Sequence, residues 1–208
     1  MPTNNQWMSA LENRHGKILQ EKFSAATAAI CGLGGLGSCV ALALARVGIG
    51  RLILIDFDIV DLANIHRQQY KINQIGMHKV DALAENILEA SQSTEIISYC
   101  EKITDENYFS LLSQADIICE CFDNPEAKAM LVDSVLDAMP QKYIVAASGM
   151  AGMESPNSIQ TRKITNHFYL CGDGESEVDE NVSLFAPRVM LCAAHQAQTI
   201  LRIIAEKF

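Results

Sequence analysis

A glycine-rich turn near the start of the chain is the first feature that could do chemistry. Its glycines stand within six residues of sequence: Gly32, Gly34, Gly35 and Gly37. The turn follows the apolar stretch 26–31, typical of a buried strand, and leads into 34–47, a run of small residues typical of a helix packed on a sheet. In such a strand–turn–helix unit, backbone N–H groups approach a phosphate and the helix points the positive end of its dipole at the anion. The spacing therefore predicts a phosphate-binding turn, with the Ser38 hydroxyl as a further donor.

An acidic residue follows at the separation that a nucleotide site needs. The stretch 51–55 predicts a second buried strand, and Asp56 ends it about 20 residues after the last glycine. A carboxylate at this place accepts hydrogen bonds from ribose hydroxyls. Strand, turn, helix, strand and acid in this order predict a nucleotide-binding site, which on these residues alone fits NAD as well as ATP.

Polar and cationic residues beyond Asp56 favour ATP. Hydride transfer to a dinucleotide needs no cations around the phosphates, whereas nucleotidyl transfer does, because negative charge builds up on the α-phosphate and on the departing pyrophosphate. The candidates to bind the nucleotide and its phosphates are Asp58, Asn64, Arg67, Gln68 and Lys79. Asp123 follows the expected fourth strand, at the edge where ligands bind open sheets, and could hold Mg²⁺. The sequence has no G-x-x-x-x-G-K-[ST] motif, which excludes a P-loop ATPase.

The elements that must position these residues alternate along the chain. Apolar stretches predict strands at 26–31, 51–55, 95–100, 116–121, 143–148 and 157–163. Other stretches predict helices at 4–23, 34–47, 76–90, 105–113 with Thr104 as N-cap, 125–138 and 186–207. This alternation predicts an α/β, Rossmann-like fold: a mostly parallel sheet with helices on both faces, and antiparallel strands in the C-terminal third.

Length and composition fit one domain in the cytoplasm. The 208 residues are 49% hydrophobic and 20% charged, which allows a well-buried core. We expect an N-terminal helix (1–24), a nucleotide-binding core (25–150) and a C-terminal part with strands, a crossover loop and a closing helix (151–208). No run approaches the ~20 apolar residues of a membrane helix, and no secretory signal is visible, so we expect a cytoplasmic protein. The formal net charge of −9 argues against nucleic acid as a partner.

The seven cysteines predict no metal centre. None are spaced C-x-x-C, whereas a structural zinc site usually needs two such pairs or equivalent histidines. No structural zinc is therefore expected. In a cytosolic protein these cysteines are expected to be mostly reduced core residues.

Five stretches of the sequence together carry a family resemblance. They read GLGGLGS (32–38), LILIDFDIVDLANIHRQ (52–68), GMHK (76–79), FDN (122–124) and APRV…AAHQA (186–197). The chain thereby resembles the ThiF/MoeB/HesA family, prokaryotic relatives of ubiquitin-activating enzymes, and most of all its short ThiF subgroup of thiamine biosynthesis. The first two stretches are typical of this family rather than of Rossmann domains in general.

The resemblance implies an ATP- and Mg²⁺-dependent adenylyltransferase. In such an enzyme, the C-terminal glycine carboxylate of a small ubiquitin-like sulfur carrier, here a ThiS-like protein ending in Gly-Gly, attacks the ATP α-phosphate and gives an acyl-adenylate and pyrophosphate. The contacts carried over are Asp56 with the ribose, Asn64, Arg67, Gln68 and Lys79 with the phosphates, and Asp123 with Mg²⁺. Family members are homodimers in which an N-terminal arginine enters the neighbour's site, and Arg14 is the candidate here. The candidate catalytic residues are thus Arg67, Lys79, Asp123 and Arg14.

Two departures from the family pattern narrow the expected chemistry. The family commonly has two zinc-binding C-x-x-C pairs, and many members have a crossover-loop cysteine that accepts the activated carrier or sulfur. Here only Cys171 lies near the first pair's place, and the loop 172–183 contains no cysteine. We therefore predict adenylation without a covalent enzyme intermediate.

The alternatives are an NAD-dependent oxidoreductase, a non-catalytic scaffold that binds a carrier, and an enzyme that adenylates a different carrier or tRNA.

Overall fold

The computed structural model describes residues 3–207, and one seven-stranded sheet runs through it in the order β3-β2-β1-β4-β5-β7-β6. Its strands are β1 (Thr27–Cys31), β2 (Arg51–Ile55), β3 (Glu95–Tyr99), β4 (Ile117–Glu120), β5 (Tyr143–Ala147), β6 (Gln160–Lys163) and β7 (Phe168–Gly172). All neighbouring strands are parallel except β6 and β7, which are antiparallel. The predicted Rossmann-like sheet, with antiparallel strands in the C-terminal third, is confirmed.

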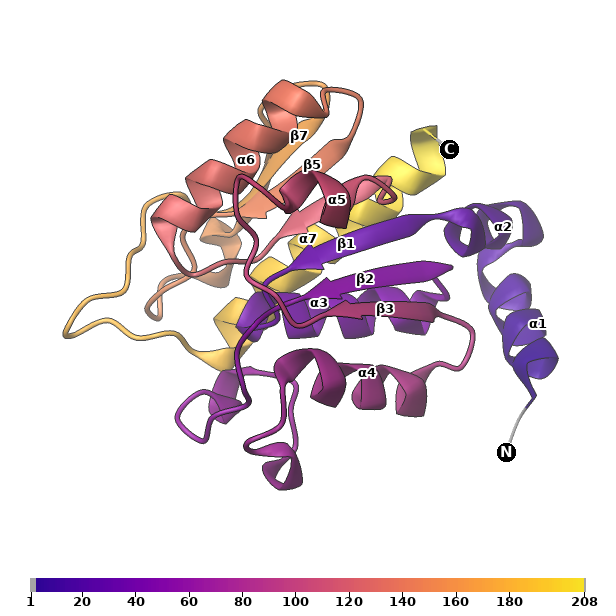
Figure 1. Cartoon of the computed structure of the whole chain (residues 1–208), viewed down its shortest axis with the longest axis horizontal. Helices are drawn as coiled ribbons and strands as arrows, with labels where there is room; N and C mark the ends of the chain where they lie inside the picture. Colours follow the sequence, from indigo (N-terminus) through magenta and orange to yellow (C-terminus); the bar gives the residue numbers. More distant parts are fainter. Residues whose placement is uncertain (1–2, 208) are drawn as a thin grey trace.

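Helices cover both faces of this sheet (Figure 1). They are α1 (Asn4–His15), α2 (Lys17–Ala25), α3 (Gly35–Val47), α4 (Lys79–Ala90), α5 (Tyr108–Leu112), α6 (Pro125–Ala138) and α7 (Ala186–Lys207), with short 3₁₀ turns η1 (Ile65–Arg67), η2 (Ile72–Gln74) and η3 (Pro156–Ser158). Strand β1 is buried on both sides: Ala28 and Ile30 enter the core layer shared with α3, α4 and α7, while Ala29 and Cys31 enter the layer shared with α5 and α6. A parallel strand covered on both faces is apolar throughout, which is why period-two alternation is missing from its sequence. None of the helices in residues 3–207 is both long and apolar enough to span a membrane.

The N-terminal segment differs from the single helix predicted over 4–23. The chain forms two helices, with Gly16 between them at φ 85°, in the left-handed region that favours glycine. The Gly16 N–H ends α1 by donating to the Glu12 carbonyl at 2.9 Å. Residues 1, 2 and 208, which belong to the expected ranges 1–24 and 151–208, lie outside the described residues.

Two other elements also differ from expectation. The helix predicted from 105 begins later than expected: α5 starts at Tyr108 with Asn107 as N-cap. Thr104 instead caps the turn before it, where its hydroxyl accepts the Glu106 N–H at 3.3 Å and its carbonyl accepts the N–H groups of Asn107 and Tyr108. In the C-terminal third, β7 is a strand that the sequence analysis did not expect. Its apolar residues pair with β5 and place the exposed β6 at the edge of the sheet.

The order of the strands places the functional segments at one edge. The chain leaves β1 for β2 on one side and later returns to β4 on the other, so the carboxyl ends of β1 and β4 flank a topological switch point. Ligands of open parallel sheets bind beside such a point. The glycine turn follows β1, Asp56 follows β2 and Asp123 follows β4, and in Figure 1 these strand ends lie on the same side of the molecule.

Candidate nucleotide-binding site

The glycine turn is held tightly between β1 and α3. A Cβ on Gly37 would stand 1.9 Å from the Gly32 carbonyl oxygen, so only glycine allows this close approach of turn and helix. The Leu33 N–H donates to Asp56 Oδ2 at 2.6 Å, and the buried Tyr70 hydroxyl donates to the Leu33 carbonyl at 2.7 Å. The turn therefore has its shape before any ligand binds.

The N-terminus of α3 has no side-chain cap. Gly34 is its N-cap residue and makes no side-chain hydrogen bond, so the first-turn N–H groups of this 13-residue helix are left for a ligand. A second observation points to the same place. Gln68 is 8% exposed, its Oε1 is buried without a hydrogen-bond partner within residues 3–207, and its Nε2 lies 3.7 Å from where a Cβ on Gly34 would stand. A buried amide with an unused end beside an uncapped helix is typical of a ligand site.

Asp56 organises the β2 end of the site. Its buried carboxylate accepts the Leu33 N–H through Oδ2 and the Asp58 N–H at 2.8 Å through Oδ1. Each carboxylate oxygen has a second lone pair, which leaves acceptors for the ribose hydroxyls that the sequence analysis assigned to it. The same acid thus shapes the turn and faces the ligand edge.

Lys79 lies at the first position of α4 and is 5% exposed. Its Nζ donates to Asp58 Oδ2 at 2.7 Å and stands 4.0 Å from Asp56 Oδ2. The structure therefore brings Lys79, Asp56 and Asp58 together, and the Lys79 ammonium forms ion pairs with both carboxylates. The carboxylate of Asp58 is half exposed, so this cluster opens to solvent at the ligand edge.

Arg67 and Asn64 lie against the glycine turn. The Arg67 guanidinium donates to Asn64 Oδ1 at 2.9 Å, and a Cβ on Gly35 would stand 3.2 Å from the Arg67 carbonyl oxygen. Ser38 joins this segment to α3, since its fully buried hydroxyl donates to the Gly34 carbonyl at 2.6 Å and accepts the Gln69 N–H at 3.1 Å. The expectation that Ser38 donates to a phosphate is thereby corrected: its proton is committed to the backbone, and it positions the turn.

The two remaining predicted residues lie in different places. Asp123 is exposed in the turn after β4, and the end of that strand packs on the glycine turn: a Cβ on Gly32 would stand 3.0 Å from both the Cys121 carbonyl oxygen and the Phe122 ring. Arg14 is exposed on α1, which lies at the opposite end of the sheet (Figure 1). The chain therefore does not bring its own Arg14 to its own site.

A buried ion pair that the sequence did not predict lies beneath the site. Glu120, fully buried at the end of β4, accepts the Phe122 N–H at 2.7 Å and the Lys128 ammonium at 2.5 Å, and Lys128 also donates to the Ala147 carbonyl at 2.8 Å. Burial raises the pKa of Glu120, and the charge of Lys128 opposes that rise. The signal that could have revealed the pair is an acid ending the otherwise apolar strand IICE. The pair shapes the turn that carries Asp123.

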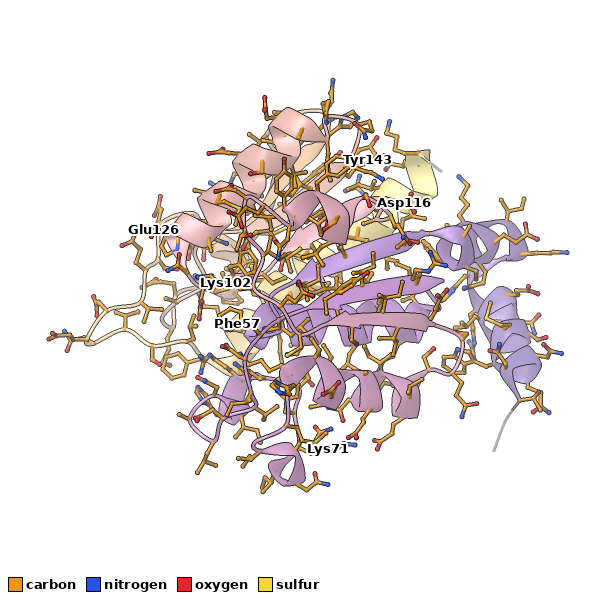
Figure 2. All side chains as sticks on the ribbon, viewed as in Figure 1. Phe57, Lys71, Lys102, Asp116, Glu126 and Tyr143 are labelled. Atoms are coloured by element: carbon orange, nitrogen blue, oxygen red, sulfur yellow. The ribbon has the colours of Figure 1, made fainter. Side chains whose placement is uncertain are left out.

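In Figure 2, Phe57, Lys102 and Glu126 lie at the carboxyl end of the sheet and Asp116 lies toward the other end. Within residues 3–207 no group of three or more His, Cys, Asp or Glu side chains is arranged to hold a metal ion. The arrangement can bind the phosphates of a nucleotide at α3 and its sugar at Asp56. The fold defines an α/β protein of the Rossmann type.

Comparison of the sequence with known families identifies the group. The chain belongs to the ThiF family, whose sequence profile matches residues 6–207. This confirms the resemblance to the ThiF/MoeB group drawn from the five sequence stretches.

Named relatives match this chain over only part of their own length. It is 35% identical over 132 residues to the adenylyltransferase and sulfurtransferase MOCS3 of Xenopus laevis, a match covering 63% of this chain and 29% of that protein. It is 31% identical over 167 residues to the ubiquitin-like modifier-activating enzyme 5 of Bombyx mori, covering 75% and 39%. The chain thus spans less than half the length of these relatives.

A solved structure matches along almost the whole chain. The Escherichia coli tRNA N6-threonylcarbamoyladenosine dehydratase TcdA, in complex with ATP, superimposes with a TM-score of 0.87 over 97% of this chain and 95% of that one, at 21% sequence identity. At this identity the likeness establishes the shared fold.

Proposed function

We propose that the chain is an ATP-dependent adenylyltransferase, a single adenylation domain that activates the C-terminal glycine carboxylate of a small ubiquitin-like carrier. The observation that carries the proposal is the group of Asn64, Arg67 and Gln68 held against the uncapped start of α3. An oxidoreductase would need no such cation beside the phosphates. Membership of the ThiF family and the adenylyltransferase named among the relatives support it.

The chemistry needs charge stabilisation rather than a protein nucleophile. A carrier carboxylate oxygen forms a bond to the α-phosphorus while the bond from that phosphorus to the bridging oxygen of pyrophosphate breaks. Negative charge grows on the α-phosphate and on the leaving group. The guanidinium of Arg67 and the first-turn N–H groups of α3 are preorganised donors for this charge, and preorganised donors stabilise a transition state without rearranging.

Lys79 and the two acids would bind the nucleoside end and the phosphates together. Asp56 accepts from the ribose, while the ammonium of Lys79, held at 2.7 Å by Asp58, supplies positive charge nearby. The half-exposed Asp58 can be hydrated if Lys79 turns toward a phosphate. Lys79 thus keeps its ionic partner until the ligand arrives.

Magnesium fits the donors that the site offers. Mg²⁺ usually binds one or two carboxylates together with substrate phosphates, and Asp123 is an exposed carboxylate in the turn beside Gly32. When bound there, the ion would neutralise charge on the departing pyrophosphate.

A homodimer would complete the site with Arg14. Since α1 lies at the far end of the sheet from the glycine turn (Figure 1), Arg14 can act only on a neighbouring copy. We propose that one protomer's Arg14 enters the other's site, as the family resemblance implies.

The carrier is proposed to be a ThiS-like sulfur carrier of thiamine biosynthesis, and the protein cytoplasmic. The competing substrate is tRNA, because the structurally similar TcdA is named as an enzyme that acts on tRNA. The formal net charge of −9 favours a protein carrier, because tRNA binding relies on neutralising phosphates.

Exchange of labelled pyrophosphate into ATP tests the proposal. With Mg²⁺ and a ThiS-like carrier ending in Gly-Gly, we expect exchange that disappears when the terminal glycine is deleted. Exchange with tRNA but not with the carrier would move the activity to tRNA. Tight NAD binding with no exchange under either condition would overturn adenylation.

The variant Arg67→Ala tests the catalytic assignment. Removing a preorganised donor to the transition state lowers turnover about 10²–10³-fold, whereas the Kd for ATP should change only a few-fold. Arg46→Ala, which removes an exposed arginine from the last turn of α3, serves as the matched control. Equal losses in turnover and ATP affinity would show that Arg67 binds the ground state instead.

A further inference from the structure

Cys100 differs from every other cysteine in the chain. Of the seven free cysteines it alone is exposed, while Cys39 is half-buried and five others are buried. It follows β3 directly, and its Sγ lies 3.3 Å from Nδ1 of His78, the exposed N-cap residue of α4. A thiol and an imidazole from two separate elements are thus paired in solvent.

The pair stands at the nucleoside end of the nucleotide site. Tyr99 pairs with Ile55 across β3 and β2, and the Asp56 N–H donates to the Tyr99 carbonyl at 3.2 Å. Cys100 and Asp56 directly follow this last pair of the two strands and therefore lie beside each other at the sheet edge. On the other side, His78 directly precedes Lys79, whose ammonium contacts Asp58. Both members of the pair adjoin residues assigned to the nucleotide.

Exposure and a neighbouring imidazole distinguish this thiol from the others. Burial raises the pKa of the thiols of Cys31, Cys39, Cys119, Cys171 and Cys192, which keeps them protonated. Thiolates, not thiols, are nucleophiles, and an imidazole that carries its proton on Nε2 can take the thiol proton at Nδ1. His78 is placed to do this for Cys100.

We propose that Cys100 and His78 form a thiol-modification site that takes low-molecular-weight disulfides, such as glutathione disulfide, and that its mixed disulfide excludes the nucleotide. The Cys100 sulfur attacks one sulfur of the disulfide; a new S–S bond forms, the old one breaks, and the leaving thiolate takes the proton held by His78. A free thiol reverses the exchange. A tripeptide attached to Cys100 would stand beside Asp56, where the proposed function places the ribose. The inference rests on nucleotide binding at Asp56 and not on the identity of the carrier.

Thiol titration under native conditions tests the reactive pair. With an aromatic disulfide reagent, we expect one fast-reacting thiol in the wild type, lost in Cys100→Ser and kept in the matched control Cys39→Ser. In His78→Gln the fast phase should slow at least tenfold, because the proton acceptor is gone. A fast phase that persists in Cys100→Ser, or that is unchanged in His78→Gln, would overturn the assignment of the pair.

Nucleotide binding tests the consequence. Protein treated with glutathione disulfide and shown by mass spectrometry to carry one adduct at Cys100 should bind ATP at least tenfold more weakly, and a thiol reductant should restore binding. Saturating ATP should in turn slow the modification. An adduct that leaves ATP affinity unchanged would refute the proposal while adenylation stands, whereas unmodified protein that binds no ATP would refute the proposed function as well.

Discussion

Lys79 and Arg188 are both almost fully buried, at 5% and 6% exposure, but they bind very different sets of partners. Arg188, in the first turn of α7, donates to the Ala151 carbonyl at 3.1 Å, to the Glu154 and Ser155 carbonyls at 3.0 and 3.1 Å, to the Ser158 hydroxyl at 3.0 Å and to Asp173 at 2.5 Å. Within residues 3–207, the Lys79 ammonium forms ion pairs with two carboxylates, Asp58 at 2.7 Å and Asp56 at 4.0 Å.

The difference separates a structural cation from one that is available to a ligand. The planar fork of Arg188 is filled by main-chain acceptors of the segment 151–158, so α7 is locked to the chain between β5 and β6. Lys79 carries a compact charge whose main partner, Asp58, is half exposed. Burial of a charged side chain alone therefore does not distinguish the two roles. The solvent exposure of its partners does, because Asp58 is half exposed and Asp173 is not.

The substitution Arg188→Met should have the largest effect, and it should be on stability. It leaves three carbonyls without their donor and removes the guanidinium from the Asp173 carboxylate, and breaking a buried pair in this way costs about 3–5 kcal/mol. Urea unfolding measures it. The control Arg202→Met, on the exposed face of the same helix with a 3.5 Å pair to Glu206, should cost less than about 0.5 kcal/mol. Equal costs for the two variants would show that the Arg188 network is not a structural lock.

The substitution Lys79→Met should instead act mainly on activity. Loss of this charge is expected to lower pyrophosphate exchange about 10²–10³-fold, with a smaller loss of stability than Arg188→Met because water can solvate Asp58. Lys71→Met, which removes an exposed lysine paired with Glu89, is the control and should keep its activity. If Lys79→Met unfolds the protein while exchange per folded molecule is normal, the two cations play the same role.

A smaller effect should appear in acid. Burial would raise the pKa of Asp173, but hydrogen bonds from the Ser176 and Glu175 N–H groups, the Ser176 hydroxyl and Arg188 lower it to about 2. Since this folded-state pKa lies below the usual 3.8, the carboxylate stabilises the fold above about pH 4, and that contribution is lost as the pH falls toward 2. The difference in unfolding free energy between wild type and Asp173→Asn should shrink over this window. Parallel curves for the two proteins would contradict it.

The parts of this molecule that local sequence dictates were predictable. The glycine turn, the acid ending β2 and the helix with Pro125 at its first turn depend on backbone sterics and hydrogen bonding over a few residues, and the alternation of strands with helices restricts the topology. Where local signals were weak, prediction failed, as at Gly16, which divides the N-terminal helix, and at Thr104, whose turn ends before α5 begins.

Residues paired across long stretches of chain were beyond the sequence. Tyr70 reaches the Leu33 carbonyl, Arg188 reaches Asp173, and Lys128 joins Glu120 to Ala147. No spacing rule relates such partners, because the distance between them is set by how helices pack on the sheet. The same packing decides the role of Ser38. Its hydroxyl could donate to a ligand, but in the fold it donates to the Gly34 carbonyl.

By itself, the sequence determined that this protein has a Rossmann-like core with a glycine turn after its first strand, because a turn that only glycine permits, followed by a strand ending in an acid, is encoded in neighbouring residues. Tertiary structure alone decided which charged groups are closed into the framework, as Arg188 is, and which keep a partner open to solvent, as Lys79 does with Asp58. That choice depends on the partners that surround each side chain after packing, and those partners come from distant parts of the chain.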